Sequence, residues 1–267
     1  MWGGFASTVF IPLIQLLLDA VGWRSTLIVL GAINLAVCAG VYWAVIDPDA
    51  DAGPSSVGAG HAAQPLNGRT AVASAARQPV FWALALAFTA FTAVFSAFTF
   101  HFYPLLIEQG LDKSAIVAVI ALIGPAQVAG RIGIWVFASR ASVRKIGSLI
   151  VLVFPIALVL LEALAPSMMV AGLVAVLYGA ANGIMTIVRG LAVPEMLTRD
   201  AYGAVNGALA APAMFARAIA PVGAAMLWAM IGSYDAVLRA AIAGSLVLVI
   251  GFWTAAILSR AKRGTSR

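Results

Sequence analysis

The sequence is poor in charge, in cysteine and in histidine. Charged residues make up 10% of its 267 positions, whereas a soluble domain usually contains about 25%. Its one cysteine, Cys38, excludes an internal disulfide and lies in an apolar segment rather than in a metal or redox motif. His61 and His101 are the only imidazoles, and the sequence has no zinc-protease, phosphate-loop or nucleophile-elbow motif. We therefore expect no enzyme, no bound metal and no cofactor.

Apolar residues, by contrast, fill 63% of positions and give a mean hydropathy of +1.03. They form continuous stretches, and a helix needs about 20 apolar residues to cross the roughly 30 Å hydrocarbon layer. Transmembrane strands would instead alternate apolar and polar residues over segments of ~10 residues. The sequence therefore predicts an all-α, polytopic bundle of eight transmembrane helices in a lipid bilayer. The expected spans are residues 2–18, 26–46, 80–107, 114–138, 144–164, 167–191, 201–228 and 235–259.

One long polar stretch separates the first two predicted spans from the other six. It is rich in aspartate, proline, glycine and serine and has few large apolar side chains, so it cannot bury a core. We interpret it as a flexible linker. The expected organisation is two helices in 1–46, the linker in 47–79, six helices in 80–260 and a short tail in 261–267.

Basic residues gather in alternate gaps between the predicted spans. Eleven fall on one side, three on the other and two within spans, which accounts for all 16. Because basic loops stay in the cytoplasm, the linker and the C-terminus are predicted to be cytoplasmic. This topology explains the pI near 10, so we expect no nucleic-acid partner. The richer side consists of Arg69, Arg77, Arg140, Arg144, Lys145, Arg189, Arg199, Arg260, Lys262, Arg263 and Arg267, and the poorer side of Arg24, Lys113 and Arg239.

Hydroxyl side chains follow one face of the third predicted span. Steps of 3, 4, 3 and 4 residues place them on one side of a helix, and they are Thr89, Thr92, Ser96, Thr99 and Tyr103. Such a stripe is typical of the wall of a water-filled cavity, which makes its last four members candidate substrate-binding residues. The alternative is that these hydroxyls bond their own backbone or hold helices together, which is common in membranes.

Two arginines lie inside predicted spans. Arg131 shares a helix face with Gln127, and Arg217 shares another with Asn206 and several alanines. Both lie within roughly 5–10 Å of the bilayer midplane, where a charge costs at least ~2.5–3.5 kcal/mol. Every aspartate and glutamate lies near a helix end or in a gap, so the sequence offers no acid at matching depth. Because a guanidinium can clamp a carboxylate with two parallel hydrogen bonds, this pattern predicts an anionic substrate.

Three stretches resemble the major facilitator superfamily, whose members join two six-helix halves by a cytoplasmic loop. They read GGFASTVFIPLIQLLLDAVGWR from residue 3, GPAQVAGRIGIWVFASRASVRKIG from residue 124 and YGAANGIMTIVRGLAVPEMLTRDAYGAVNGAL from residue 178. They are similar to the fifth span, the eighth span and the tenth-to-eleventh connection of bacterial monocarboxylate and oxalate/formate carriers. The resemblance implies that the eight spans match spans five to twelve, with no counterpart of spans one to four. The turn after residue 138 departs from the superfamily's loop motif, because it lacks the Asp-Arg pair.

The resemblance also implies a function. It indicates a secondary carrier of the bacterial inner membrane that moves a small organic anion, such as a monocarboxylate, by alternating access as a symporter or antiporter. Arg131 matches an eighth-span arginine used in substrate binding, and Arg217 lies near an eleventh-span cation. A coupling proton is compatible with this function but has no visible site. The alternative is a non-transporting membrane scaffold or a truncated remnant of a carrier.

Other interpretations stay open for individual residues. An acid in the absent spans could pair with either arginine, or Arg131 could extend its side chain to the cytoplasmic surface. Asn182, on one face with Tyr178 and Arg189, either contacts the substrate or bonds a neighbouring helix. His101 is either a proton-handling residue or an ordinary interfacial side chain.

Overall fold

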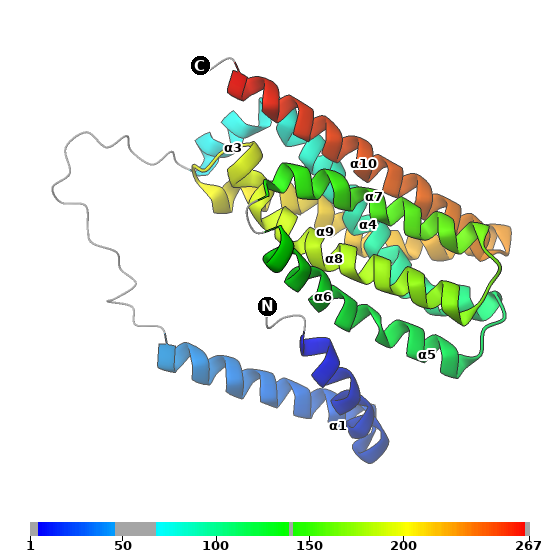
Figure 1. Cartoon of the computed structure of the whole chain (residues 1–267). Coiled ribbons are helices and arrows are strands. Elements are labelled where there is room, and N and C mark those ends of the chain that lie inside the picture. The colour runs from blue at the N-terminus through cyan, green and yellow to red at the C-terminus, as the bar shows by residue number, and fades with distance from the viewer. Residues whose placement is uncertain (1–4, 46–67, 139–140, 265–267) are drawn as a thin grey trace. The chain divides into compact units, whose positions relative to one another are not determined.

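The computed structural model describes residues 5–45, 68–138 and 141–264, and it divides the chain into two compact units, Trp2–Gln64 and Pro65–Arg267. Each unit is treated by itself below. Throughout the described ranges both units are helical and contain no strand (Figure 1). Seven helices within those ranges are long and apolar enough to cross a membrane. The predicted all-α membrane bundle is therefore confirmed.

The first unit contains helix α1, Phe5–Val45, which is broken at Gly22. Gly22 has a φ of 73°, a left-handed conformation that glycine adopts readily because it has no Cβ. The Thr26 hydroxyl donates to the Gly22 carbonyl at 2.8 Å, just after the break. The two arms of α1 correspond to the predicted spans 2–18 and 26–46, although residues 2–4 and 46 lie outside the described ranges. The spanning segment in α1 is Leu16–Ala44, so the first predicted span is not recovered as a separate one.

The second unit is a bundle of antiparallel helices that match the six spans predicted after the linker (Figure 1). Helix α4 packs mainly against α9 and α10, while α8 packs mainly against α6 and α7. The helices are α3 (Gly68–Ala76), α4 (Pro79–Glu108), α5 (Lys113–Ala121), α6 (Ile123–Phe137), α7 (Val143–Ala163), α8 (Met168–Met196), α9 (Tyr202–Ile231) and α10 (Tyr234–Gly264).

Helix α3 corrects the prediction of a flexible linker over 47–79. It packs against α9 and α4, and its buried residues are Ala71 and Ala75. Trp82 of α4 donates its indole N–H to the Ala76 carbonyl at 2.8 Å, which ties the end of α3 to the bundle. Two alanines four residues apart lie on one helix face, and only the neighbouring helices give that face something to pack on. Residues 47–67 of the predicted linker lie outside the described ranges.

Prolines shape two of the spans. The fourth predicted span is divided into α5 and α6 at Leu122, because Pro125 has no N–H for the Ala121 carbonyl and its ring crowds that carbonyl. In α8, Pro194 leaves the carbonyl four residues earlier without its helical donor. That carbonyl, of Gly190, accepts a hydrogen bond at 2.9 Å from the Tyr202 hydroxyl at the start of α9.

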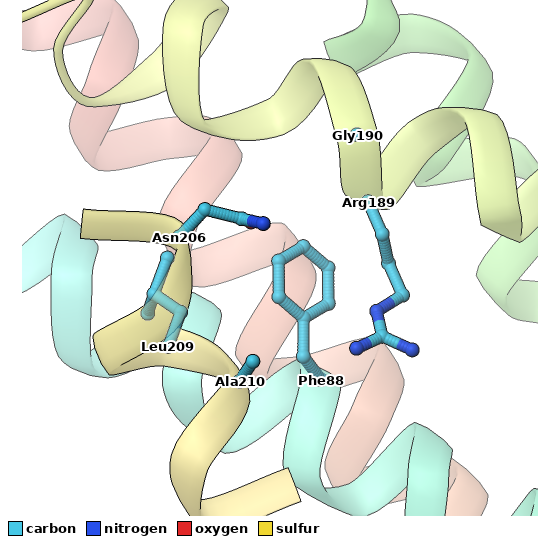
Figure 2. A pocket seen from close by; sticks show the side chains of 6 residues that line it. All are labelled: Phe88, Arg189, Gly190, Asn206, Leu209 and Ala210. Atoms are coloured by element: carbon cyan, nitrogen blue, oxygen red, sulfur yellow. The ribbon is translucent and has the colours of Figure 1, made fainter. Parts of the chain in front are cut away.

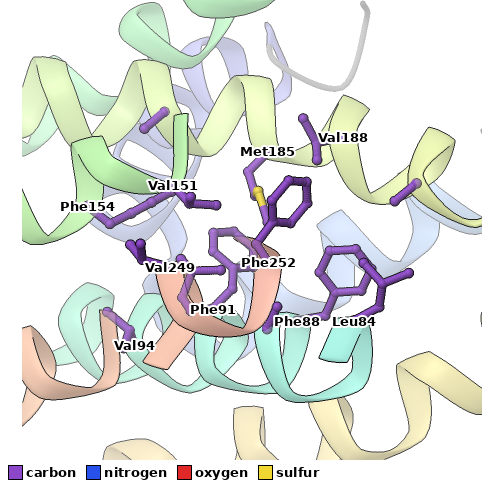
Figure 3. Packing of buried hydrophobic residues seen from close by; sticks show 14 of the residues in the cluster. Leu84, Phe88, Phe91, Val94, Val151, Phe154, Met185, Val188, Val249 and Phe252 are labelled. Carbon is purple, nitrogen blue, oxygen red and sulfur yellow. The ribbon is translucent and has the colours of Figure 1, made fainter. Parts of the chain in front are cut away.

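The core of the second unit is aromatic and lies where α4, α7, α8 and α10 meet (Figure 3). Phe154 of α7 packs edge-on against Phe91 of α4 at 5.4 Å and against Tyr178 of α8 at 5.3 Å between ring centroids. Phe252 of α10 is fully buried and lies against Gly147, where an added Cβ would fall within 2.1 Å of the ring. A larger residue at that crossing of α7 and α10 would therefore have to displace the buried Phe252 ring.

Hydrogen bonds between helix ends distinguish the two ends of the bundle. Glu195, near the end of α8, accepts the backbone N–H groups of Val143 at 2.8 Å and Arg144 at 3.3 Å, at the start of α7. Its carboxylate also lies 3.9 Å from the Arg144 guanidinium. We call this the basic end, defined by the first residues of α4, α7 and α9 and the last residues of α6 and α8; it carries the loops predicted to be cytoplasmic. At the opposite end, Arg239 pairs with Glu162 at 2.7 Å.

Candidate functional site

Arg131 lines a cavity of about 320 Å³ between α6, α7 and α8, here called the Arg131 cavity. The half-buried side chain donates from Nε to the Gly183 carbonyl of α8 at 3.3 Å. Arg131 precedes Phe137, the end of α6, by six residues, so it lies about 9 Å from the basic end. The other described lining residues are all apolar and include no acid: Ile134, Trp135, Ala138, Ala141, Val143, Ile146, Ile184, Ile187, Val188 and Leu191.

Arg189 lines a second cavity, of about 100 Å³, between α4, α8 and α9, here called the Arg189 cavity. Its guanidinium lies over Phe88 at 5.6 Å and over Phe91 at 5.8 Å from the ring centroids, distances at which a cation is attracted to an aromatic face. Figure 2 shows the guanidinium beside the Phe88 ring and Asn206 on the other side of that ring. The remaining lining residues are Gly190, Leu209 and Ala210.

Arg217 lies on α9, the helix with the most exposed surface in the second unit. Its side chain is exposed and does not line either cavity. Because Pro221 has no N–H, the Arg217 carbonyl lacks its helical donor. The buried Ser96 hydroxyl of α4 donates to this carbonyl at 2.8 Å, which joins α4 to α9 beside the arginine.

Most hydroxyl groups of the predicted stripe donate hydrogen bonds to backbone carbonyls. Thr92 donates to the Phe88 carbonyl at 2.7 Å and Thr99 donates to the Phe95 carbonyl at 2.7 Å. Together with the Ser96 bond, these contacts are those of the alternative interpretation, in which hydroxyls bond backbone and join helices. Tyr103 is 38% exposed, and no member of the stripe lines either cavity.

The other predicted site residues are not gathered at one point. Arg131 and Arg217 lie on α6 and α9 and share no cavity among the described residues. Gln127 is on α6 with Arg131, and its backbone closely contacts Gly183 of α8. Asn182 is buried at 6% exposure on α8 and lines neither cavity. The substrate role of each of these residues stays a prediction.

The count of basic residues assigned Arg189 to a cytoplasmic gap, although the predicted span 167–191 contains it, and the structure places it inside α8. It precedes Met196, the end of α8, by seven residues, which is about 10 Å from the basic end. A signal for this position was present in the sequence, because Arg189 continues the helix face of Asn182 and Tyr178. Asn206, the other polar side chain of the cavity, comes from α9. Its position in the same cavity as Arg189 could be found only from the tertiary structure.

His101 belongs to a network at the opposite end of the bundle. Its Nε2 lies 2.9 Å from the Pro221 carbonyl of α9, and its Nδ1 lies 3.3 Å from the Tyr234 hydroxyl of α10. Glu108 accepts from the Trp228 indole at 3.1 Å and from the Tyr234 backbone N–H at 2.7 Å. These bonds join α4, α9 and α10, and the proton-handling role of His101 stays a prediction.

Two comparisons with known proteins bear on this site. A family model described as Major Facilitator Superfamily matches residues 1–221, which include α1, α3 to α8 and most of α9. No curated protein matches the chain.

Proposed function

The chain belongs to the major facilitator superfamily, and on this basis we propose that the solute it carries is a small organic anion. Membership makes it a multi-pass membrane protein that transports small solutes. The proposal adds the charge of the solute and the residues that bind it. We also propose that the protein lies in the bacterial inner membrane with its C-terminus in the cytoplasm. We further propose that it belongs to the group of monocarboxylate and oxalate/formate carriers.

The observation that carries this proposal is a set of three arginines inside spans without acidic partners. Arg131, Arg189 and Arg217 form no ion pair in the ranges that the structure describes, where the ion pairs are Arg144–Glu195 and Arg239–Glu162. A charge at membrane depth costs at least ~2.5–3.5 kcal/mol unless it meets a partner or water. An anionic solute supplies such a partner for the time that it is bound. A carboxylate fits best, because a guanidinium binds it through two parallel hydrogen bonds.

Alternating access gives the exposed face of α9 a role. Carriers of this kind rock one half against the other around a site near the bilayer midplane. Arg217 follows Tyr202, the start of α9, by 15 residues, or about 22 Å, which supports a position near that midplane. We propose that α4 to α10 form one half and that the Arg217 face of α9 lines the pathway. Arg131 then contributes a second cation from α6.

Substitution of Arg217 tests the proposal. We expect Arg217→Ala to weaken binding of propionate, a simple monocarboxylate, by roughly 2–4 kcal/mol, and Arg217→Lys to be intermediate because it keeps the charge but loses the planar fork. Binding is measured by isothermal titration calorimetry on the purified full chain, and uptake by proteoliposomes. Arg199→Ala, which removes an exposed arginine beyond the end of α8, is the matched control. Wild-type binding and uptake by well-folded Arg217→Ala would exclude the clamp, and a wild-type chain that binds no carboxylate would favour the scaffold alternative.

A further inference from the structure

Among the described residues that line the Arg131 cavity, the one charged group is Arg131, and it lies at the inner end of the cavity. On α6 the lining runs from Arg131 to Ala138, and on α8 it runs from Ile184 to Leu191, each over a rise of about 10 Å toward the basic end. Side chains lean toward the N-terminus of their helix, and α6 runs toward the basic end, so the Arg131 side chain leans away from that end. Its bond to the carbonyl of Gly183, one residue before Ile184, agrees with this direction. The cavity is therefore a slot with a cation at its inner end.

The walls of this slot suit a hydrocarbon chain. Apart from Arg131, the described lining residues of α6, α7 and α8 are aliphatic side chains and one tryptophan. The volume of about 320 Å³ lies in the range of small-molecule pockets, roughly 300–1,000 Å³, which are mostly apolar with a few polar groups that fix the orientation of the ligand. Because Arg131 bonds Gly183 through Nε, the donors on its two terminal nitrogens can face a carboxylate.

A phospholipid does not match this arrangement of charge and apolar surface. Its phosphate lies in the headgroup layer with the acyl chains deeper, whereas here the cation lies about 9 Å inside the basic end and the apolar walls lie between it and that end. The order is that of a free acid whose carboxylate is innermost.

Resting on the proposed function, we infer that the carrier takes a monocarboxylate with a medium-length apolar chain, and that the Arg131 cavity is the pocket for this chain. The carboxylate meets the Arg131 guanidinium, and the chain lies between α6, α7 and α8 and points toward the basic end. The length and volume of the slot then set the preferred chain, and residues along it, such as Ile187 of α8, determine specificity.

The test compares hexanoate with propionate, which has the same carboxylate on a shorter chain, by isothermal titration calorimetry on the purified full chain. Each methylene that leaves water strengthens binding about four-fold, so we expect wild-type protein to bind hexanoate roughly 10- to 60-fold more tightly. Ile187→Trp narrows the slot and should remove most of this preference. Ile156→Trp makes the same substitution at an exposed position of α7 outside the cavity and should keep it. Arg131→Gln removes the cation and should weaken hexanoate binding by about 10-fold or more.

The outcomes separate this inference from the proposed function. Equal affinity of wild-type protein for hexanoate and propionate would overturn the chain pocket and keep the anion carrier. A full preference for hexanoate in folded Ile187→Trp, judged by its thermal melting, would place the chain elsewhere and would also overturn the inference. Unchanged hexanoate binding by folded Arg131→Gln would overturn it independently. A wild-type chain that binds neither anion would overturn both proposals.

Discussion

Hydroxyl side chains in this bundle complete the hydrogen bonding of carbonyls that prolines leave without a donor. Ser96 does so for the Arg217 carbonyl and Tyr202 for the Gly190 carbonyl. In a membrane, an unpaired backbone group has no water to bond, so a neighbouring helix must supply the donor. Both residues therefore stabilise contacts between helices. Ser96 joins α4 to α9 beside Arg217, and Tyr202 joins α9 to α8 beside Arg189.

At the residue scale, we expect Ser96→Ala to destabilise the protein by about 1 kcal/mol, because the Arg217 carbonyl loses its donor. Thr92→Val should cost less, since Thr92 bonds the Phe88 carbonyl within its own helix, where the backbone N–H of Thr92 is also in place. Stability is measured by thermal unfolding in detergent.

A double-mutant cycle makes this prediction specific. Pro221→Ala restores an N–H for the Arg217 carbonyl, so Ser96→Ala should cost little in the Pro221→Ala background. Strictly additive effects of the two substitutions would show that the hydrogen bond is not what joins α4 to α9.

At the scale of elements, the contact between α6 and α8 depends on glycine. An added Cβ at Gly183 would lie 2.1 Å from the Gln127 carbonyl oxygen, and one at Gly130 would lie 2.4 Å from the Ala180 carbonyl oxygen. Such spacing of small residues allows backbones to approach closely, as is usual between membrane helices. The close approach brings Arg131 within hydrogen-bonding distance of the Gly183 carbonyl. Packing of α6 on α8 therefore builds the Arg131 cavity.

We expect Gly183→Ala to destabilise the protein by about 1–3 kcal/mol, because α6 must move away from α8. Gly133→Ala is the matched control: Gly133 is on α6 and has nothing within 4 Å of an added Cβ, so alanine there should be neutral or slightly stabilising. Thermal unfolding in detergent measures both. Equal melting temperatures for the two variants would contradict the packing seen between α6 and α8.

At the scale of the whole molecule, the distribution of basic residues predicts which end of the bundle is cytoplasmic. The basic end of the second unit carries Arg199 in the turn before α9, and the opposite end carries Asp112 in the turn before α5. Both residues are exposed. Basic loops remain inside, so the two ends should differ in access to reagents added outside cells.

Cysteine labelling tests this orientation in a Cys38→Ser background, since Cys38 is exposed. An impermeant maleimide added to intact cells should modify Asp112→Cys and spare Arg199→Cys, and cell lysis should make Arg199→Cys reactive. Labelling of Arg199→Cys in intact cells, with Asp112→Cys protected, would reverse the topology.

The sequence by itself determined the all-α class, the apolar spans and the family, because the length and continuity of apolar runs are local properties of a chain in a bilayer. It also predicts that Arg131 and Arg217 lie at membrane depth, since depth follows from position along a helix. Composition misled at α3, where alanines acquire a buried face only from neighbouring helices. The count of basic residues assigned Arg189 to a cytoplasmic gap although the predicted span 167–191 already contained it, and α8 continues seven residues past it.

Only the tertiary structure decided which side chains share a space. It separated Arg131 from Arg217, placed Arg189 with Phe88 and Asn206, and directed the Ser96 hydroxyl to a carbonyl of α9. The reason is that periodicity fixes the direction of a side chain around its own helix, whereas its neighbours depend on which helices pack together and how closely they approach.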